Sequence, residues 1–187
     1  IQVIIATGKT RASAINVMAQ LGLEAPGVFT QGLVICNADG SIRHQRVLDR
    51  ETAVQLIQFA EAHNLPQSAY CGFKILAPRP SVYQQLLHEK YHEPPLEIVG
   101  PLLNLVDDLR INKFLVSDEI NNDETRRQLE RLVGAKAVVT QAVAEYIEVL
   151  PPGASKGRGV QMLLDDLGFV PHEMLAIGDG ENDLEML

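Results

Sequence analysis

The stretch richest in side chains that could do chemistry is GDGEND, at residues 178–183. It contains two aspartates, Asp179 and Asp183, and one carboxamide, Asn182, separated by small or polar residues. Oxygen ligands at this spacing suit a hard cation such as Mg²⁺, because hard cations prefer carboxylate and carbonyl oxygens. The alternative interpretation is an acidic turn that caps a helix beginning near Asp183, since Asp and Asn are favoured at helix starts.

The acidic loop follows an apolar run, MLAI, at residues 174–177. A short apolar run bounded by turn residues predicts a buried strand. The acidic loop would then lie at the carboxyl end of a strand, where open α/β sheets place their ligand crevices.

A second strand, loop and helix stand at the beginning of the chain. Apolar residues 4–6 lead into the polar turn Thr7-Gly8-Lys9-Thr10, and a helical pattern follows before Gly22. Helix amino termini attract anions, so we expect Thr7 and Gly8 to bind a phosphate group. The string GKT is also part of the P-loop pattern, but that pattern needs a glycine where Val3 stands, which excludes a P-loop.

A third loop, LPPGASKG at residues 150–157, joins an alternating strand to an amphipathic helix. Its Lys156 adds positive charge where the helix dipole is already positive, and a bound anion would rationalise that placement. The alternative interpretation is a solvated surface lysine, which is the commoner state of an isolated Lys.

In this order, the three loops resemble the haloacid dehalogenase superfamily of phosphohydrolases, specifically Cof-type members with a type IIB cap. ATGK is similar to the family's second motif, ASKG to its third and GDGEND to its fourth. Residues 27–35 and the turn at 37–40 resemble the hairpin that follows the second motif. Two substitutions depart from the pattern: Gln31-Gly32 replaces the usual Asn-Gly, and Lys9 stands where Arg is commoner.

The resemblance implies a Mg²⁺-dependent phosphatase that acts on a small phosphorylated metabolite, a sugar phosphate or similar, through an aspartyl-phosphate intermediate. The catalytic side chains that it implies in this chain are Thr7, Lys156, Asp179 and Asp183. The phosphate-binding residues that it implies are Thr7, Gly8, Lys156 and Asn182. For the metal it implies Asp179 as a ligand, with Asp183 holding the ion or orienting a metal-bound water or the loop beside it.

The family's first motif, a strand ending in Asp-x-Asp-Gly-Thr, is absent, and with it the aspartate nucleophile. Asp107 and Asp108 lack the glycine and hydroxyl residue that should follow them. Because the chain begins at Ile1 rather than Met, we interpret it as a fragment and expect roughly 30 further residues upstream to carry that motif. A phosphometabolite-binding module without turnover remains the alternative.

The order of the pattern predicts an α/β fold, a Rossmann-like core with a parallel sheet interrupted by an inserted α/β cap. We expect the core to occupy residues 1–47 and 149–187 and the cap to occupy residues 48–148. The cap would begin with an amphipathic helix within residues 49–64.

A rival pattern lies inside the expected cap. His88, Glu89 and His92 fit the zinc-protease pattern HExxH, which on a helix places both imidazoles on one face. No third ligand motif follows the break at Pro94-Pro95, so a zinc metalloprotease is the less favoured alternative to a solvated helix face. A calcium loop is excluded, because Leu184 stands where an EF-hand needs glycine.

Composition limits the partners. The chain has 187 residues, a net charge of -8 and 46% hydrophobic residues, which favours a globular fold and argues against nucleic acid as a partner. No apolar run reaches membrane-spanning length. Cys36 and Cys71 show no metal, redox or disulfide spacing, so we expect a reducing compartment such as the cytoplasm. Nothing in the sequence fixes an oligomeric state or the identity of the substrate.

Overall fold

The computed structural model describes residues 1–187, apart from the side chains of Ala142 and Glu181. The chain forms two compact units. The first consists of Ile1–Arg46 and Gly153–Leu187, and the second of Val47–Pro152. The boundaries expected after residues 47 and 148 lie one and four residues from these, and the assignment of the units as core and cap stays a prediction.

A four-stranded sheet forms the centre of the first unit, in the order β1-β2-β3-β4. Its strands are β1 (Ile5–Ala6), β2 (Gly27–Phe29), β3 (Val34–Cys36) and β4 (Ile42–Gln45). β1 pairs parallel with β2, and the other neighbours pair antiparallel. Within this chain the parallel part of the sheet is therefore confined to β1 and β2.

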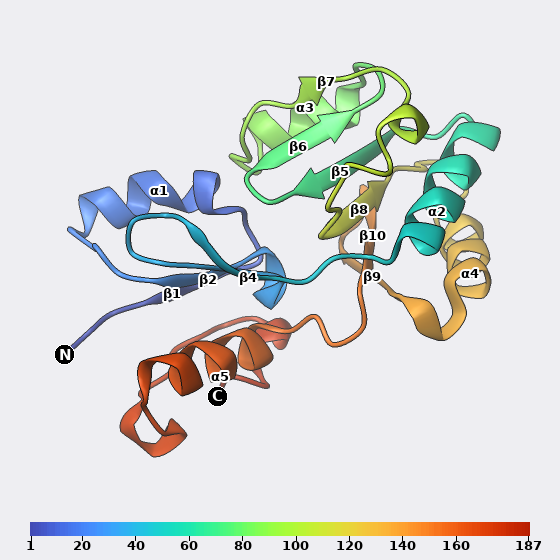
Figure 1. The fold of residues 1–187 in the computed structure, drawn as a ribbon. Coiled ribbons are helices and arrows are strands. Elements are labelled where there is room, and N and C mark those ends of the chain that lie inside the picture. Colours follow the sequence, from blue (N-terminus) through green and yellow to red (C-terminus); the bar gives the residue numbers. More distant parts are fainter. The chain divides into compact units, whose positions relative to one another are not determined.

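Two helices cover opposite faces of this sheet (Figure 1). Successive side chains of a strand point to opposite faces, so Phe29 of β2 packs against α1 (Arg11–Gln20) and Val28 packs against α5 (Lys156–Leu167). Leu21 follows the end of α1 and is exposed. The first unit is thus a helix–sheet–helix sandwich.

The strand expected at residues 174–177 does not form, and that prediction is wrong. Leu175 and Ile177 are 86% and 85% exposed. A strand needs a hydrogen-bonding neighbour, and in the described part of the chain β1 pairs only with β2. An apolar pocket of about 710 Å³ lies between residues 1–6 and residues 174–177, lined by side chains of both segments.

The second unit contains a six-stranded sheet in the order β7-β6-β5-β8-β10-β9. All neighbours are antiparallel except β6 and β7. Its strands are β5 (Gln67–Cys71), β6 (Lys74–Ala77), β7 (Glu97–Ile98), β8 (Lys113–Val116), β9 (Val138–Val143) and β10 (Tyr146–Leu150).

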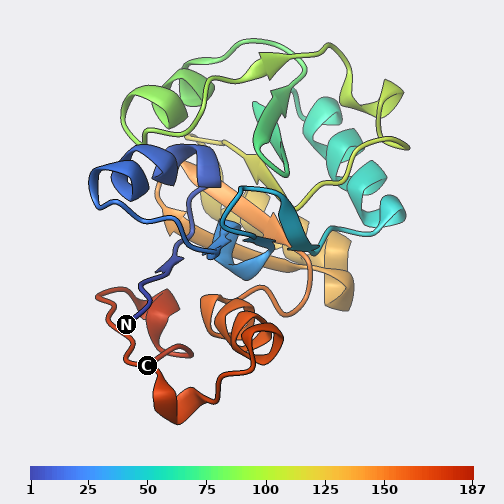
Figure 2. The same ribbon diagram turned by 60° about the vertical axis from the view of Figure 1, so that its left-hand side comes forward.

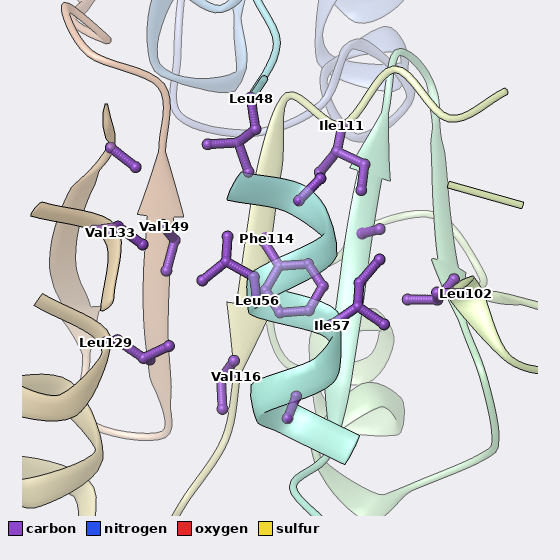
Figure 3. Close-up of a cluster of buried hydrophobic side chains, with 14 of the residues drawn as sticks. Leu48, Leu56, Ile57, Leu102, Ile111, Phe114, Val116, Leu129, Val133 and Val149 are labelled. Atoms are coloured by element: carbon purple, nitrogen blue, oxygen red, sulfur yellow. The ribbon is translucent and has the colours of Figure 1, made fainter. Parts of the chain in front are cut away.

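One face of this sheet is covered by α2 (Arg50–Ala62) and α4 (Asn122–Val133). Figure 3 shows Leu56 and Ile57 of α2 gathered with Phe114 of β8 in the resulting core. The amphipathic helix expected within residues 49–64 is confirmed: Asp49 caps it by accepting a hydrogen bond of 2.9 Å from the Thr52 amide.

The other face carries α3 (Val82–Glu89), whose Leu87 packs with Tyr70 of β5 and Tyr146 of β10. Figure 2 shows this helix and the strands beside it from a second direction. Both faces of the second sheet are therefore covered. None of the helices in the described part of the chain combines the length and apolar character that crossing a lipid bilayer requires.

Candidate functional site

Lys156 is the first residue of α5, and it is 9% exposed. Ser155 caps the helix, because its hydroxyl accepts a hydrogen bond of 3.0 Å from the Arg158 amide. The Lys156 ammonium donates to Asn182 Oδ1 at 3.1 Å and to Asp183 Oδ1 at 2.7 Å. The interpretation of Lys156 as a solvated surface lysine is therefore wrong.

Asp183 is the anion that accounts for a cation at this helix start. It is 4% exposed, and its second oxygen accepts a hydrogen bond of 3.0 Å from the Gly180 amide. The hydrogen bond from Lys156 holds the pKa of the Asp183 carboxyl below its usual value. A bound anion is not needed to rationalise the placement of Lys156, so that part of the sequence argument is corrected.

Glycines position this cluster by allowing backbones to approach closely, a role that the sequence argument missed. A Cβ on Gly157 would lie 2.4 Å from the Glu185 carbonyl oxygen, and one on Gly159 would lie 2.8 Å from the Cα of Gly32. Real side chains do not fit at such distances. The only sequence signal was the Gly-x-Gly spacing directly after Lys156.

The loop at Thr7 and Gly8 extends the β1–β2 pairing, since the Thr7 amide donates to the Val28 carbonyl at 2.9 Å. The Thr7 hydroxyl accepts a hydrogen bond of 3.2 Å from the Lys9 amide. Thr10 caps α1, so Thr7 and Gly8 lie ahead of the helix rather than in its first turn. Thr7 and Gly8 are partly exposed, which leaves them accessible to a ligand.

The predicted site residues therefore fall into three places. Lys156, Asn182 and Asp183 form one hydrogen-bonded cluster. Thr7 and Gly8 lie on a separate loop that contacts the same turn, residues 30–32, as the start of α5 does. Asp179 is exposed, and its side chain takes part in neither group.

The donor set fits one Mg²⁺ ion held mainly by water. Within the described side chains, no three His, Cys, Asp or Glu residues gather as a metal cluster. Mg²⁺ commonly uses only one or two carboxylates and keeps several waters, and the exposed carboxylate of Asp179 suits that pattern. Both oxygens of Asp183 already accept hydrogen bonds, which favours a positioning role for this residue.

The HExxH interpretation does not match the structure. Helix α3 ends at Glu89, and His92 lies beyond it with a left-handed φ of 56°. The two imidazoles therefore do not share a helix face. His88 Nδ1 is also engaged, at 2.7 Å from the Glu93 carbonyl oxygen.

Comparison with known proteins decides the family. The sequence profile of the haloacid dehalogenase-like hydrolases matches residues 1–187. The chain belongs to this family. A solved haloacid dehalogenase-like hydrolase from Bacteroides thetaiotaomicron has a TM-score of 0.88 at 21% identity, over 100% of this chain and 71% of that one. The predicted α/β fold of the haloacid dehalogenase-like hydrolases, with its Rossmann-like core, is thereby confirmed.

Two relatives show how much of a longer protein the chain spans. It is 35% identical to the Arabidopsis thaliana protein named chloroplastic endoribonuclease YBEY, over 100% of this chain and 34% of that protein. It is 26% identical to the HMP-PP phosphatase of Enterobacter sp. (strain 638), over 97% of this chain and 66% of that protein. The chain thus spans about a third of the plant relative and about two thirds of the bacterial one.

Proposed function

We propose that the protein containing this chain is a Mg²⁺-dependent phosphatase that hydrolyses a small phosphorylated metabolite. One observation carries the proposal: Lys156 is buried at a helix start, with its ammonium held by Asn182 and Asp183. An ammonium fixed in this way is preorganised to neutralise charge on a phosphoryl group, and such preorganisation is often the largest single contribution to catalysis.

The remaining residues take roles consistent with their places. The Thr7 hydroxyl donates a hydrogen bond to a phosphoryl oxygen, and the Gly8 amide donates to the same oxygen. Lys156 balances the charge of nucleophile and phosphoryl group, and the Asn182 carboxamide contacts the phosphate. Asp179 would hold Mg²⁺, which would supply further neutralisation of phosphoryl charge.

The nucleophile is expected on a strand outside residues 1–187. Attack of its carboxylate on phosphorus would give an aspartyl-phosphate and release the alcohol, and water would then release phosphate. The apolar pocket between residues 1–6 and residues 174–177 supports the proposal, because it adjoins the unpaired edge of β1. A parallel strand placed there would cover Ile177 and end beside Thr7.

We further infer that the second unit is the cap that selects the substrate. The alternative, a phosphate-binding module without turnover, shares the site and lacks the nucleophile. The name HMP-PP phosphatase supports a phosphorylated small molecule as substrate. The endoribonuclease name belongs to a protein about three times as long as the matched region.

The test is Asp179→Asn in the full-length protein, assayed with a generic phosphate ester over a range of Mg²⁺ concentrations. Loss of an anionic metal ligand should raise the Mg²⁺ requirement and lower turnover by roughly a hundredfold or more. Asp165→Asn is the matched control, since this exposed carboxylate on α5 only accepts a hydrogen bond from Gln161. Unchanged Mg²⁺ dependence in Asp179→Asn would contradict the proposal. Ligand binding without turnover in the unsubstituted protein would favour the binding module.

A further inference from the structure

The turn at residues 30–32 has a backbone conformation that is rare for its sequence. Thr30, Gln31 and Gly32 have consecutive left-handed φ values of 50°, 56° and 84°. Non-glycine residues seldom adopt positive φ, and for a β-branched residue such as Thr30 it is a clear outlier. Thr30 is also completely buried, and its hydroxyl has no hydrogen-bond partner among the described atoms. Such strain persists only where the surrounding structure enforces it, and it clusters at functional sites.

On one side, the turn binds the backbone of the Thr7 loop. The Thr30 amide donates to the Lys9 carbonyl at 2.9 Å, and the Gln31 amide donates to the Thr7 carbonyl at 3.2 Å. The Gln31 side chain lies over Gly8, since a Cβ there would be 3.4 Å from Gln31 Cγ. The left-handed conformation thus directs two consecutive amides at the two carbonyls that flank Gly8.

On its other side, the turn meets the start of α5. A Cβ on Gly32 would lie 1.9 Å from the Ser155 carbonyl oxygen, so the two backbones touch. That carbonyl accepts the first hydrogen bond of the helix, from the Gly159 amide at 3.1 Å. The next residue after Ser155 is Lys156, so a shift at Gly32 would be transmitted to the ammonium.

We propose that residues 30–32 are a positioning element that sets the spacing between the Thr7–Gly8 loop and Lys156, so that both bind the same anion. The anion role rests on the proposed function, whereas the mechanical coupling of the two loops does not. The element acts through backbone contacts rather than by touching the substrate. Its strain is retained because reacting groups must be held within a fraction of an ångström, and a displacement of about 1 Å can cost a hundredfold in rate.

The first test compares Gly32→Ala with Gly40→Ala in the full-length protein. Both glycines have left-handed φ, 84° and 89°, so both substitutions carry similar backbone strain. A Cβ on Gly40 meets only the flexible guanidinium of Arg11, whereas one on Gly32 meets the Ser155 backbone. Gly32→Ala should weaken binding of inorganic phosphate by about tenfold or more, and Gly40→Ala should change it less than about twofold. Equal losses in the two variants would overturn the proposal.

A second variant keeps the proposal testable if Gly32→Ala fails to fold. Gln31→Gly removes the steric cost of positive φ, so the melting temperature should stay level or rise. Phosphate affinity and kcat should nevertheless fall, because a glycine at position 31 keeps the amide but no longer confines the turn to the one conformation that directs it at the Thr7 carbonyl. Asn tolerates a left-handed backbone, so Gln31→Asn should keep the phosphate affinity and kcat close to those of the unsubstituted protein. If the turn served stability alone, phosphate affinity would instead change in parallel with the melting temperature across these variants.

A measurement without ligand separates this proposal from the proposed function. Hydrogen exchange should show the Thr30 and Gln31 amides and the Gly159 amide losing protection together in Gly32→Ala. A loss confined to Gly159 would disprove the coupling of the two loops. If the unsubstituted protein binds no inorganic phosphate while the joint loss is seen, the phosphatase proposal fails and the mechanical coupling stands.

Discussion

Among the described side chains, each unit of the molecule buries one lysine–carboxylate pair. In the second unit, Lys113 of β8 lies 3.3 Å from Glu148 of β10, with its ammonium 4.3 Å from the centre of the Tyr70 ring. In the first unit, Lys156 lies 2.7 Å from Asp183. Both lysine side chains are about nine-tenths buried or more.

The surroundings of the two pairs differ more than their chemistry. Lys113 and Glu148 lie on neighbouring strands of a sheet whose two faces are covered, and burial raises the pKa of the adjacent Tyr70 well above its ordinary value. Lys156 is the first residue of α5, and Asp183 is the last residue of a short 3₁₀ helix at residues 181–183. Both belong to the unit in which, among the described residues, β1 has a strand on one side alone. A buried ion pair is by itself weak evidence for a functional site. What distinguishes the Lys156–Asp183 pair from the Lys113–Glu148 pair is its position at the ends of secondary-structure elements.

The largest expected effect follows from exchanging each lysine for methionine. In the full-length protein, Lys156→Met should lower the rate of phosphoryl transfer by roughly a hundredfold or more, because a preorganised cation is lost. Lys113→Met should leave the rate per folded molecule within a few fold. Single-turnover phosphate release measures both, and a normal rate in Lys156→Met would remove Lys156 from the catalytic residues.

Stability should rank the same two variants in the opposite order. Lys113→Met removes the cationic partner of Glu148 in the interior of the second unit, and breaking a buried pair in this way typically lowers the free energy of unfolding by about 3–5 kcal/mol. Lys156→Met also destabilises, but less, because the Gly180 amide still binds Asp183. Urea unfolding of both variants gives the comparison, and a smaller loss for Lys113→Met would contradict it.

The loss of stability at acid pH should show how much the Lys156–Asp183 pair contributes. The pKa of Asp183 is lowered in the folded protein, so its contribution is present above the ordinary aspartate pKa and is lost as pH falls through the lowered value. Asp183→Asn should therefore lower stability at neutral pH and flatten the loss of stability as pH falls below the ordinary aspartate pKa. Thermal unfolding of both proteins across that range measures it, with Asp165→Asn as the control. An unchanged acid limb would show that the pair contributes little.

How much the sequence could predict depended on how local each signal was. The apolar face of α2 followed from Ala53, Leu56, Ile57 and Ala60, all of which are buried, because helical periodicity is a local property. The strand at residues 174–177 was wrong, since strand formation needs a neighbour that the described chain does not provide.

The site shows the same limit. Lys156, Asn182 and Asp183, which the family resemblance implies as site residues, lie together in the structure. The resemblance could not show that Asp183 neutralises Lys156, because the two are 27 residues apart and meet only through packing. The close contact of Gly32 with Ser155 was likewise invisible, since it depends on two backbones that are distant in sequence.

The smallest effect is expected from the histidines of the second unit, and it tests whether catalysis belongs to the first unit alone. His88→Ala with His92→Ala should leave phosphate hydrolysis within a few fold and should not change the metal content of the purified protein. Because α3 ends at Glu89, the two rings do not share a helix face.

A carbonyl only accepts, so His88 Nδ1 donates to the Glu93 carbonyl oxygen, and losing this bond should lower the free energy of unfolding by about 0.5–1.5 kcal/mol. His63→Ala is the matched control, since His63 Nδ1 likewise lies 2.9 Å from the Phe59 carbonyl oxygen. Metal analysis, calorimetry and a peptidase assay decide the matter: stoichiometric zinc that disappears in the double variant, together with peptidase activity, would move a catalytic centre into the second unit.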